Sequence, residues 1–267
     1  MWSRRLAAGA VLLTLAFLIL RDGPAVHAPS SERAAAVAPE RIRVPAEPRI
    51  VSRAAWHADE TIVKEKAQYT GAARAVFIHH TNNGNRYDCA DAPEMLRAVQ
   101  SDHVNDEGWD DIGYNFVVDR CGTIYEGRAG GVTRSVRGAH TKGFNADTVG
   151  IAALGTFSDP TTPVPQPMLD AIERIAAWKL RPGTDPHGMV TLVSTNSESL
   201  YPKGNSADLN VISGHRDSYG TDCPGDALYA KLPEIREKTA ALRKAASGSV
   251  DLLPAKARAT GKRTAGQ

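Results

Sequence analysis

Three short apolar runs constrain the fold of this chain more than any other feature of its sequence. They are AVFIHH at residues 75–80, TVGIAALG at 148–155 and LNVISGH at 209–215. An apolar run of this length, bounded by polar and turn residues, is typical of a strand that is buried on both faces of a sheet. We therefore expect a sheet whose faces are covered by other elements.

Amphipathic helices are expected between these strands. Helical spacing of apolar residues predicts helices over residues 90–105, 166–180 and 226–244. Pro233 interrupts or kinks the third of them. Segments 113–127 and 189–205 are typical of strand pairs around a turn. Strands interleaved with helices predict an α/β, or mixed α+β, single domain with a central mixed β-sheet flanked by helices.

The N-terminus carries an export pattern. A basic start, MWSRR, precedes an apolar run at residues 6–20, and small residues follow at Val26 and Ala28. This pattern predicts a signal peptide over residues 1–28, with an uncleaved signal anchor in the membrane as the alternative. Either form implies a secreted, extracellular or cell-wall-associated domain, in a compartment where disulfides form.

Composition sets the remaining boundaries. It predicts an Ala/Pro-rich linker at 29–47, a folded domain at 48–246 and a disordered basic tail at 247–267. The tail is either solvated or adheres to an anionic surface such as a cell wall. The formal net charge of only +2 argues against a nucleic-acid partner. We expect a monomer.

Two histidines and a cysteine are candidates for a metal site. His79 and His215 each end a predicted strand, and Cys223 is one of only three cysteines. Functional side chains gather where strands end, and zinc binds mixed His and Cys ligands tetrahedrally. Three protein ligands leave a fourth position for water, which marks a catalytic site. Hydrogen-bonded histidines without a metal are the alternative at this point.

Five stretches of the chain occur in an order that is highly specific. They are IVSRAAW at 50–56, VFIHHT at 76–81, GWDDIGYNFVVDRCGTIYEGR at 108–128, GAHTKGFNADTVGIAALG at 138–155 and GHRDSYGTDCPG at 214–225. Together they resemble the peptidoglycan recognition proteins of the zinc amidase kind, which are related to phage amidase-type lysozymes. The resemblance implies a Zn²⁺-dependent N-acetylmuramoyl-L-alanine amidase. Such an enzyme binds peptidoglycan and cuts the amide between the lactyl group of N-acetylmuramic acid and L-alanine.

The same resemblance assigns roles around the metal. It makes His79, His215 and Cys223 the zinc ligands, and binding-only members lose this cysteine, commonly to serine. Tyr114 matches the catalytic tyrosine, whose hydroxyl would orient the attacking water or donate to the oxyanion. Thr221 stands where phage-type members have a lysine, so its catalytic role could only be a neutral hydrogen bond. The alternative for Thr221 is a hydroxyl that caps a turn.

Further residues are implied in a substrate groove: His80, Trp109, Arg128, His140 and Asn145. The fork of an arginine suits the carboxylates of the stem peptide. The tryptophan would stack on sugar or peptide, with a buried position as the alternative. His103 lies on the apolar face of its predicted helix, so we expect it in the core rather than at the metal.

The resemblance assigns Cys223 to zinc and leaves Cys89 and Cys121 as the predicted disulfide. Such a bridge closes a loop of about 30 residues and contributes about 3–4 kcal/mol. Two other functions compete with the amidase: a non-catalytic peptidoglycan-binding module, and a zinc peptidase acting on the stem peptide. The full set of candidate residues argues against the first. The absence of an H-E-x-x-H motif removes the commonest signature of the second.

Overall fold

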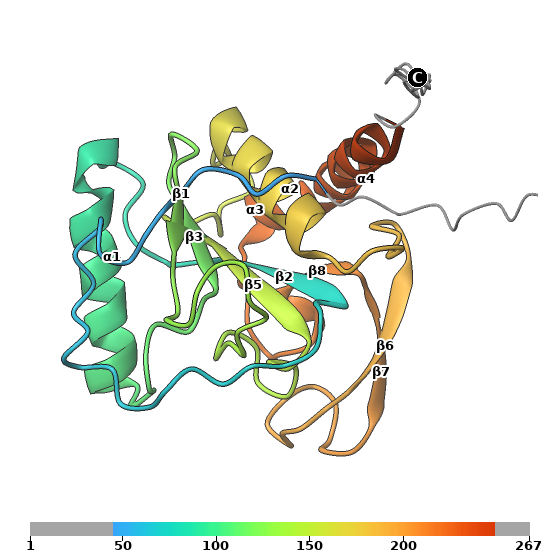
Figure 1. Cartoon of the computed structure of the whole chain (residues 1–267), viewed down its shortest axis with the longest axis horizontal. Coiled ribbons are helices and arrows are strands. Elements are labelled where there is room, and N and C mark those ends of the chain that lie inside the picture. Colours follow the sequence, from blue (N-terminus) through green and yellow to red (C-terminus); the bar gives the residue numbers. More distant parts are fainter. Residues whose placement is uncertain (1–44, 249–267) are drawn as a thin grey trace, which may run out of the picture. The chain divides into compact units, whose positions relative to one another are not determined.

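The computed structural model describes residues 45–248 and shows a mixed sheet between helices (Figure 1). Its strand order is β1-β4-β3-β5-β2-β8. The strands are β1 (Ile50–Val51), β2 (Ala75–His80), β3 (Phe116–Val118), β4 (Ile124–Glu126), β5 (Thr148–Ala153) and β8 (Ile212–Gly214). β3 and β4 pair antiparallel and the other neighbours pair parallel, so the sheet is mixed, as expected.

Helices cover both faces of this sheet. The helical elements are η1 (Cys89–Asp91), α1 (Ala92–Ser101), the π-helical turn η2 (Asp102–Asp106), α2 (Gln166–Lys179), η3 (His215–Asp217), α3 (Asp226–Tyr229) and α4 (Leu232–Gly248). Leu96 of α1 packs into one apolar cluster, and Ile172 of α2 and Ile235 of α4 pack into another. The third predicted helix is divided into α3 and α4 close to Pro233, as the sequence indicated.

Strand β5 shows why the apolar runs lack polar alternation. Ala152 belongs to the cluster on the α1 side, whereas Ile151 and Ala153 belong to the cluster under α2 and α4. All six residues of β5, and all six of β2, are therefore buried. Full burial of an isoleucine such as Ile151 stabilises the fold by about 1.5–3 kcal/mol.

A two-stranded ribbon stands apart from the main sheet. It consists of β6 (Met189–Val193) and β7 (Ser206–Asn210), which pair antiparallel at the lower right of Figure 1. The segment that joins them, residues 194–205, reaches the site described below. The sequence placed both strands within 189–205, whereas the second strand lies at Ser206–Asn210. The predicted strand at 209–215 is therefore divided, because its first two residues belong to β7 and only Ile212–Gly214 form β8.

The described residues all belong to one compact unit. The predicted leader, the linker up to residue 44 and the tail beyond residue 248 lie outside the described residues. Between residues 45 and 248, no helix has the length and apolar character needed to cross a membrane.

Candidate functional site

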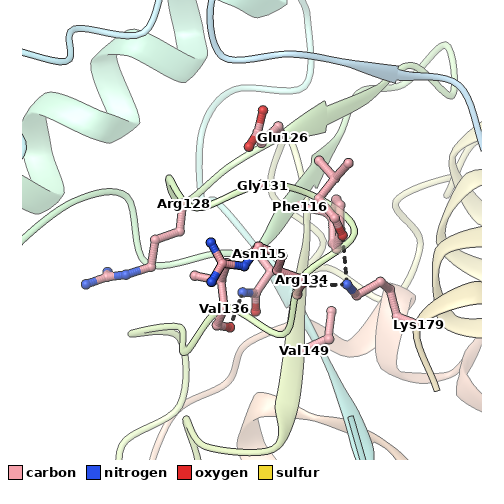
Figure 2. Close-up of a pocket in the computed structure, with 10 residues that line it drawn as sticks. Asn115, Phe116, Glu126, Arg128, Gly131, Arg134, Val136, Val149 and Lys179 are labelled. Carbon is pink, nitrogen blue, oxygen red and sulfur yellow. Dashed lines mark hydrogen bonds between the residues drawn. The ribbon is translucent and has the colours of Figure 1, made fainter. Parts of the chain in front are cut away.

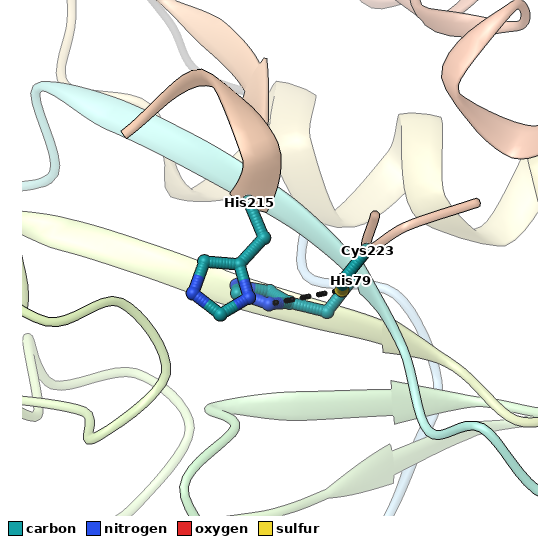
Figure 3. Close-up of side chains that lie close together, drawn as sticks. All are labelled: His79, His215 and Cys223. Atoms are coloured by element: carbon teal, nitrogen blue, oxygen red, sulfur yellow. Dashed lines mark hydrogen bonds between the residues drawn. The ribbon is translucent and has the colours of Figure 1, made fainter. Parts of the chain in front are cut away.

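Three side chains converge at one edge of the sheet. His79 lies near the end of β2, His215 directly follows β8, and Cys223 lies in the loop before α3. Because β2 and β8 are parallel neighbours, both histidines emerge at the same edge. Their candidate ligand atoms and the sulfur all lie within 4.8 Å of one another. Figure 3 shows the three side chains together, with Cys223 Sγ 3.8 Å from His79 Nδ1.

The protonation states of these residues suit a metal. Burial, the main cause, holds the pKa of His79 well below its ordinary value and lowers the pKa of His215 to about 4. Both imidazoles are therefore neutral at pH 7, which is the form that binds metals. Burial raises the pKa of the Cys223 thiol to about 12, and a bound cation reverses this effect. Two imidazoles and one thiolate fit Zn²⁺ with a fourth position left for another ligand.

Thr141 connects the candidate ligand His79 to a second buried histidine. Its Oγ1 lies 3.4 Å from His79 Nε2 and 3.0 Å from His140 Nδ1. Because His79 Nδ1 faces Cys223, the proton of His79 belongs on Nε2, which donates to Thr141. The Thr141 hydroxyl then donates to His140 Nδ1. Among the described residues, the buried His140 Nε2 has no hydrogen-bond partner. The sequence did not single out Thr141, although it lies in the quoted GAHT stretch.

Two neighbours fix the place of His140. A Cβ on Gly150 would lie 2.3 Å from the Cγ of the His140 ring, so only glycine leaves space at this point of β5. Asn145 Oδ1 accepts from the backbone N–H groups of His140 and Thr141, each at 2.8 Å. Asn145 therefore shapes the turn that carries these two side chains, and its substrate role stays a prediction.

Tyr114 lies beside the candidate metal ligands. Its ring centroid is 5.3 Å from that of His79, and its hydroxyl donates to the His80 carbonyl at 3.4 Å. Burial raises the pKa of Tyr114 above its ordinary value, so the phenol stays protonated as a hydrogen-bond donor. The structure thus brings the predicted catalytic tyrosine to the predicted ligands.

His80 and Thr221 are placed around Cys223. The N–H of His80 donates to Cys223 Sγ at 3.4 Å, and His80 Nδ1 accepts from the Phe157 N–H at 3.2 Å. The buried His80 thus helps to position the Cys223 sulfur. Thr221 Oγ1 accepts from the Cys223 N–H at 3.2 Å. This contact caps the turn, which is the alternative role predicted for Thr221. The substrate role of His80 and the catalytic role of Thr221 stay predictions.

A hollow of about 400 Å³ opens beside His215. Trp109 and His140, both predicted in the groove, line it together with His103, Lys142 and Tyr219, which the sequence did not assign to it. His103 is buried, as predicted, and yet reaches the hollow. Its Nδ1 accepts from the Gly113 N–H at 3.0 Å, and its ring lies 4.5 Å from that of Trp109.

A second, polar hollow of about 180 Å³ holds Arg128 and Asn145, the other two predicted groove residues. Arg137 and Lys66 also line it, and Ala139 lines both hollows. The hollow contains three cations against the single carboxylate of Asp110. The arrangement favours an anionic ligand, in keeping with the role predicted for Arg128.

Side chains of α2 and of the residue before β3 hold the loop that carries Arg128 in place. Lys179 of α2 donates to the Val132 carbonyl at 2.7 Å and to the Arg134 carbonyl at 3.0 Å. Figure 2 shows Lys179 next to Arg134. Asn115 Nδ2 donates to the Val136 carbonyl at 2.9 Å in the same figure. The backbone N–H of Arg128 itself donates to the Tyr114 carbonyl at 2.8 Å. The arginine and the tyrosine therefore keep a fixed relation to each other.

The predicted disulfide is present. Cys89 and Cys121 are joined with their Cα atoms 6.3 Å apart, and Cys223 is the free cysteine. The bridge ties the start of the α1 region to the turn between β3 and β4.

Residues 69–226 match the family described as N-acetylmuramoyl-L-alanine amidase. Peptidoglycan-recognition protein LB of Drosophila melanogaster is 31% identical over 186 residues, which are 69% of this chain and 67% of that protein. An N-acetylmuramoyl-L-alanine amidase of Sus scrofa is 35% identical over 159 residues, but these are only 22% of its length.

Solved structures agree in fold. Drosophila PGRP-LB superposes with a TM-score of 0.52 at 27% identity, covering 69% of this chain and 92% of that one. A tyrosine-to-phenylalanine mutant of the same protein, in complex with tracheal cytotoxin, gives a TM-score of 0.53 at 27% identity, with the same coverage of both chains. The chain therefore belongs to the peptidoglycan recognition protein and N-acetylmuramoyl-L-alanine amidase family.

Proposed function

We propose that this chain is an exported, Zn²⁺-dependent N-acetylmuramoyl-L-alanine amidase that binds peptidoglycan. Its reaction is hydrolysis of the amide between the lactyl group of N-acetylmuramic acid and the L-alanine of the stem peptide. The observation that carries the proposal is the convergence of His79, His215 and Cys223 within 4.8 Å. Tyr114, the hollow that His215 lines and the polar hollow that shares Ala139 with it add to the proposal.

Each of these residues has its own part in the reaction. His79, His215 and Cys223 would hold the metal, which when bound would supply Lewis acidity and activate water for attack on an amide carbonyl. The protonated Tyr114 hydroxyl donates to the negative charge that develops on the carbonyl oxygen. Thr141 fixes the tautomer of His79. The polar hollow binds the carboxylates of the stem peptide through Arg128.

The residue pattern at 1–28 supports the export part of the proposal, and a membrane anchor at 6–20 is its other form. The disulfide between Cys89 and Cys121 accords with an oxidising compartment.

Product analysis on defined muropeptides tests the function. The zinc-loaded full chain should release a peptide with a free L-alanine amino group, together with the intact muramyl sugar, as mass spectrometry would detect. Removal of the metal by chelation should stop the release, and added Zn²⁺ should restore it. Binding without any release would make the chain a binding module, and a cut inside the stem peptide would make it a peptidase.

A further inference from the structure

Tyr219 and Lys142 form the part of the large hollow that lies beyond His215. The Tyr219 ring stacks on the His215 ring, with centroids 5.3 Å apart and planes 15° apart. Lys142 Nζ lies 5.7 Å from the centroid of the Tyr219 ring. Both side chains line the hollow, and Tyr219 is only half-buried although it stacks on His215. An aromatic ring and a cation thus lie next to a candidate metal ligand.

A separate segment of the chain holds this pair in place. Lys142 forms an ion pair with Glu198, which belongs to the loop between β6 and β7. The same loop is bonded to both segments that carry the pair. The Thr195 N–H donates to the Gly143 carbonyl at 2.9 Å, and the Leu200 N–H donates to the Ser218 carbonyl at 3.0 Å. The Lys142 ammonium uses one of its three N–H groups to donate to Glu198, so two N–H groups are left for other acceptors.

The positions of Arg128 and of the pair Tyr219 and Lys142 along the groove indicate which part of a substrate the pair would contact. Ala139 lines both the polar hollow with Arg128 and the large hollow, whereas Tyr219 and Lys142 line the large hollow and not the polar one. In the proposed reaction the scissile amide lies at the metal ligands, with the peptide on one side and the lactyl sugar on the other. If the peptide carboxylates lie toward Arg128, the sugar lies toward Tyr219.

We propose that Tyr219 and Lys142 form a subsite for the muramyl sugar ring, an inference that rests on the proposed function. The apolar C–H face of a pyranose packs on an aromatic ring, and the ammonium donates to its hydroxyl or N-acetyl oxygens. The enzyme then distinguishes a glycan-bearing stem peptide from the same peptide that carries only a lactyl group.

Two matched substrates test the subsite in the zinc-loaded full chain. One is an N-acetylmuramoyl peptide, and the other is the same peptide acylated with D-lactate alone, so the scissile amide is identical. We expect the wild type to favour the first in kcat/KM. Tyr219→Ala should lower the ratio of the two kcat/KM values by about 3- to 10-fold, the effect of losing one aromatic contact. Tyr219→Phe, which keeps the ring, should hold that ratio within about 2-fold of the wild type.

Zinc content is measured in every variant, because Tyr219 touches a candidate ligand. Equal losses on both substrates in Tyr219→Ala would overturn the subsite, since the residue would then act only through His215. A wild-type ratio near one would overturn it as well. If neither substrate is cut, the proposed function fails, and calorimetric Kd values for the two compounds give the ratio instead. A Kd preference for the sugar that Tyr219→Ala removes then supports the subsite, and no preference overturns it.

Discussion

Replacement of Thr141 by valine isolates the link between His79 and His140. Valine has nearly the shape of threonine but has no hydroxyl. The change leaves His79 Nε2 and His140 Nδ1 without the partner that lies 3.4 and 3.0 Å away. Both histidines are buried, with exposed fractions of 1% and 4%, so water does not replace the hydroxyl.

The expected magnitude follows from this burial. A buried polar group without a partner costs about 1–3 kcal/mol. With two such groups, the free energy of unfolding of the metal-free protein should fall by at least about 2 kcal/mol. Zinc affinity should fall by about 10- to 100-fold, because the His79 tautomer with a free Nδ1 is no longer enforced.

Two measurements check this prediction. Urea unfolding gives the stability change, and competition with a chromophoric chelator gives the zinc Kd. Thr141→Ser keeps the hydroxyl and should retain zinc affinity within about 3-fold, which makes it the matched control. A valine variant that is folded and binds zinc as tightly as the wild type would refute the role of Thr141 in fixing the tautomer.

Three other changes probe the rest of the site. Cys223→Ser should abolish hydrolysis and weaken zinc binding while a muropeptide still binds, and unchanged turnover would remove Cys223 from the metal. Tyr114→Phe should keep the zinc and lower kcat by about 10²–10³-fold in steady-state assays, and a wild-type rate would leave the tyrosine a structural role only. The double change Cys89→Ala with Cys121→Ala removes a bridge of sequence separation 32, which the loop-entropy relation puts at about 3.7 kcal/mol in urea unfolding. Loss of less than about 1 kcal/mol would contradict that relation here.

The sequence predicted the sheet and the two candidate metal-binding histidines for the same reason. A strand buried on both faces has a continuous apolar run, and the residue where that run ends lies at the edge of the sheet. His79 and His215 both end such runs, and β2 and β8 prove to be parallel neighbours. Cys223 was a candidate only because one of three cysteines is left over from a pair, and the resemblance made it a ligand and added Tyr114.

Tertiary contacts that leave no local pattern were not predictable. Thr141 is one polar residue among many in its stretch, and only the fold brings its hydroxyl between two imidazoles. Lys142 and Glu198 are 56 residues apart and meet because the loop of the β6–β7 ribbon folds back. His103 fitted a core stripe and is buried, yet it also lines the hollow.

Different interactions stabilise the two sides of the groove, which are the side with His103 and Tyr114 and the side with the candidate metal ligands. The disulfide fixes the start of the α1 region, which leads to His103, against the β3–β4 turn that follows Tyr114. The candidate metal ligands depend on other contacts, since the His80 N–H donates to Cys223 Sγ and the Arg216 N–H donates to the Cys223 carbonyl at 2.9 Å. Loss of the bridge should therefore lower the stability of the fold and disturb the side of the groove that contains Tyr114, while zinc affinity stays close to that of the wild type. Stability and zinc affinity should therefore respond differently to a reductant that cleaves the disulfide. Stability should fall first, because the bridge supports the groove but not the candidate metal ligands.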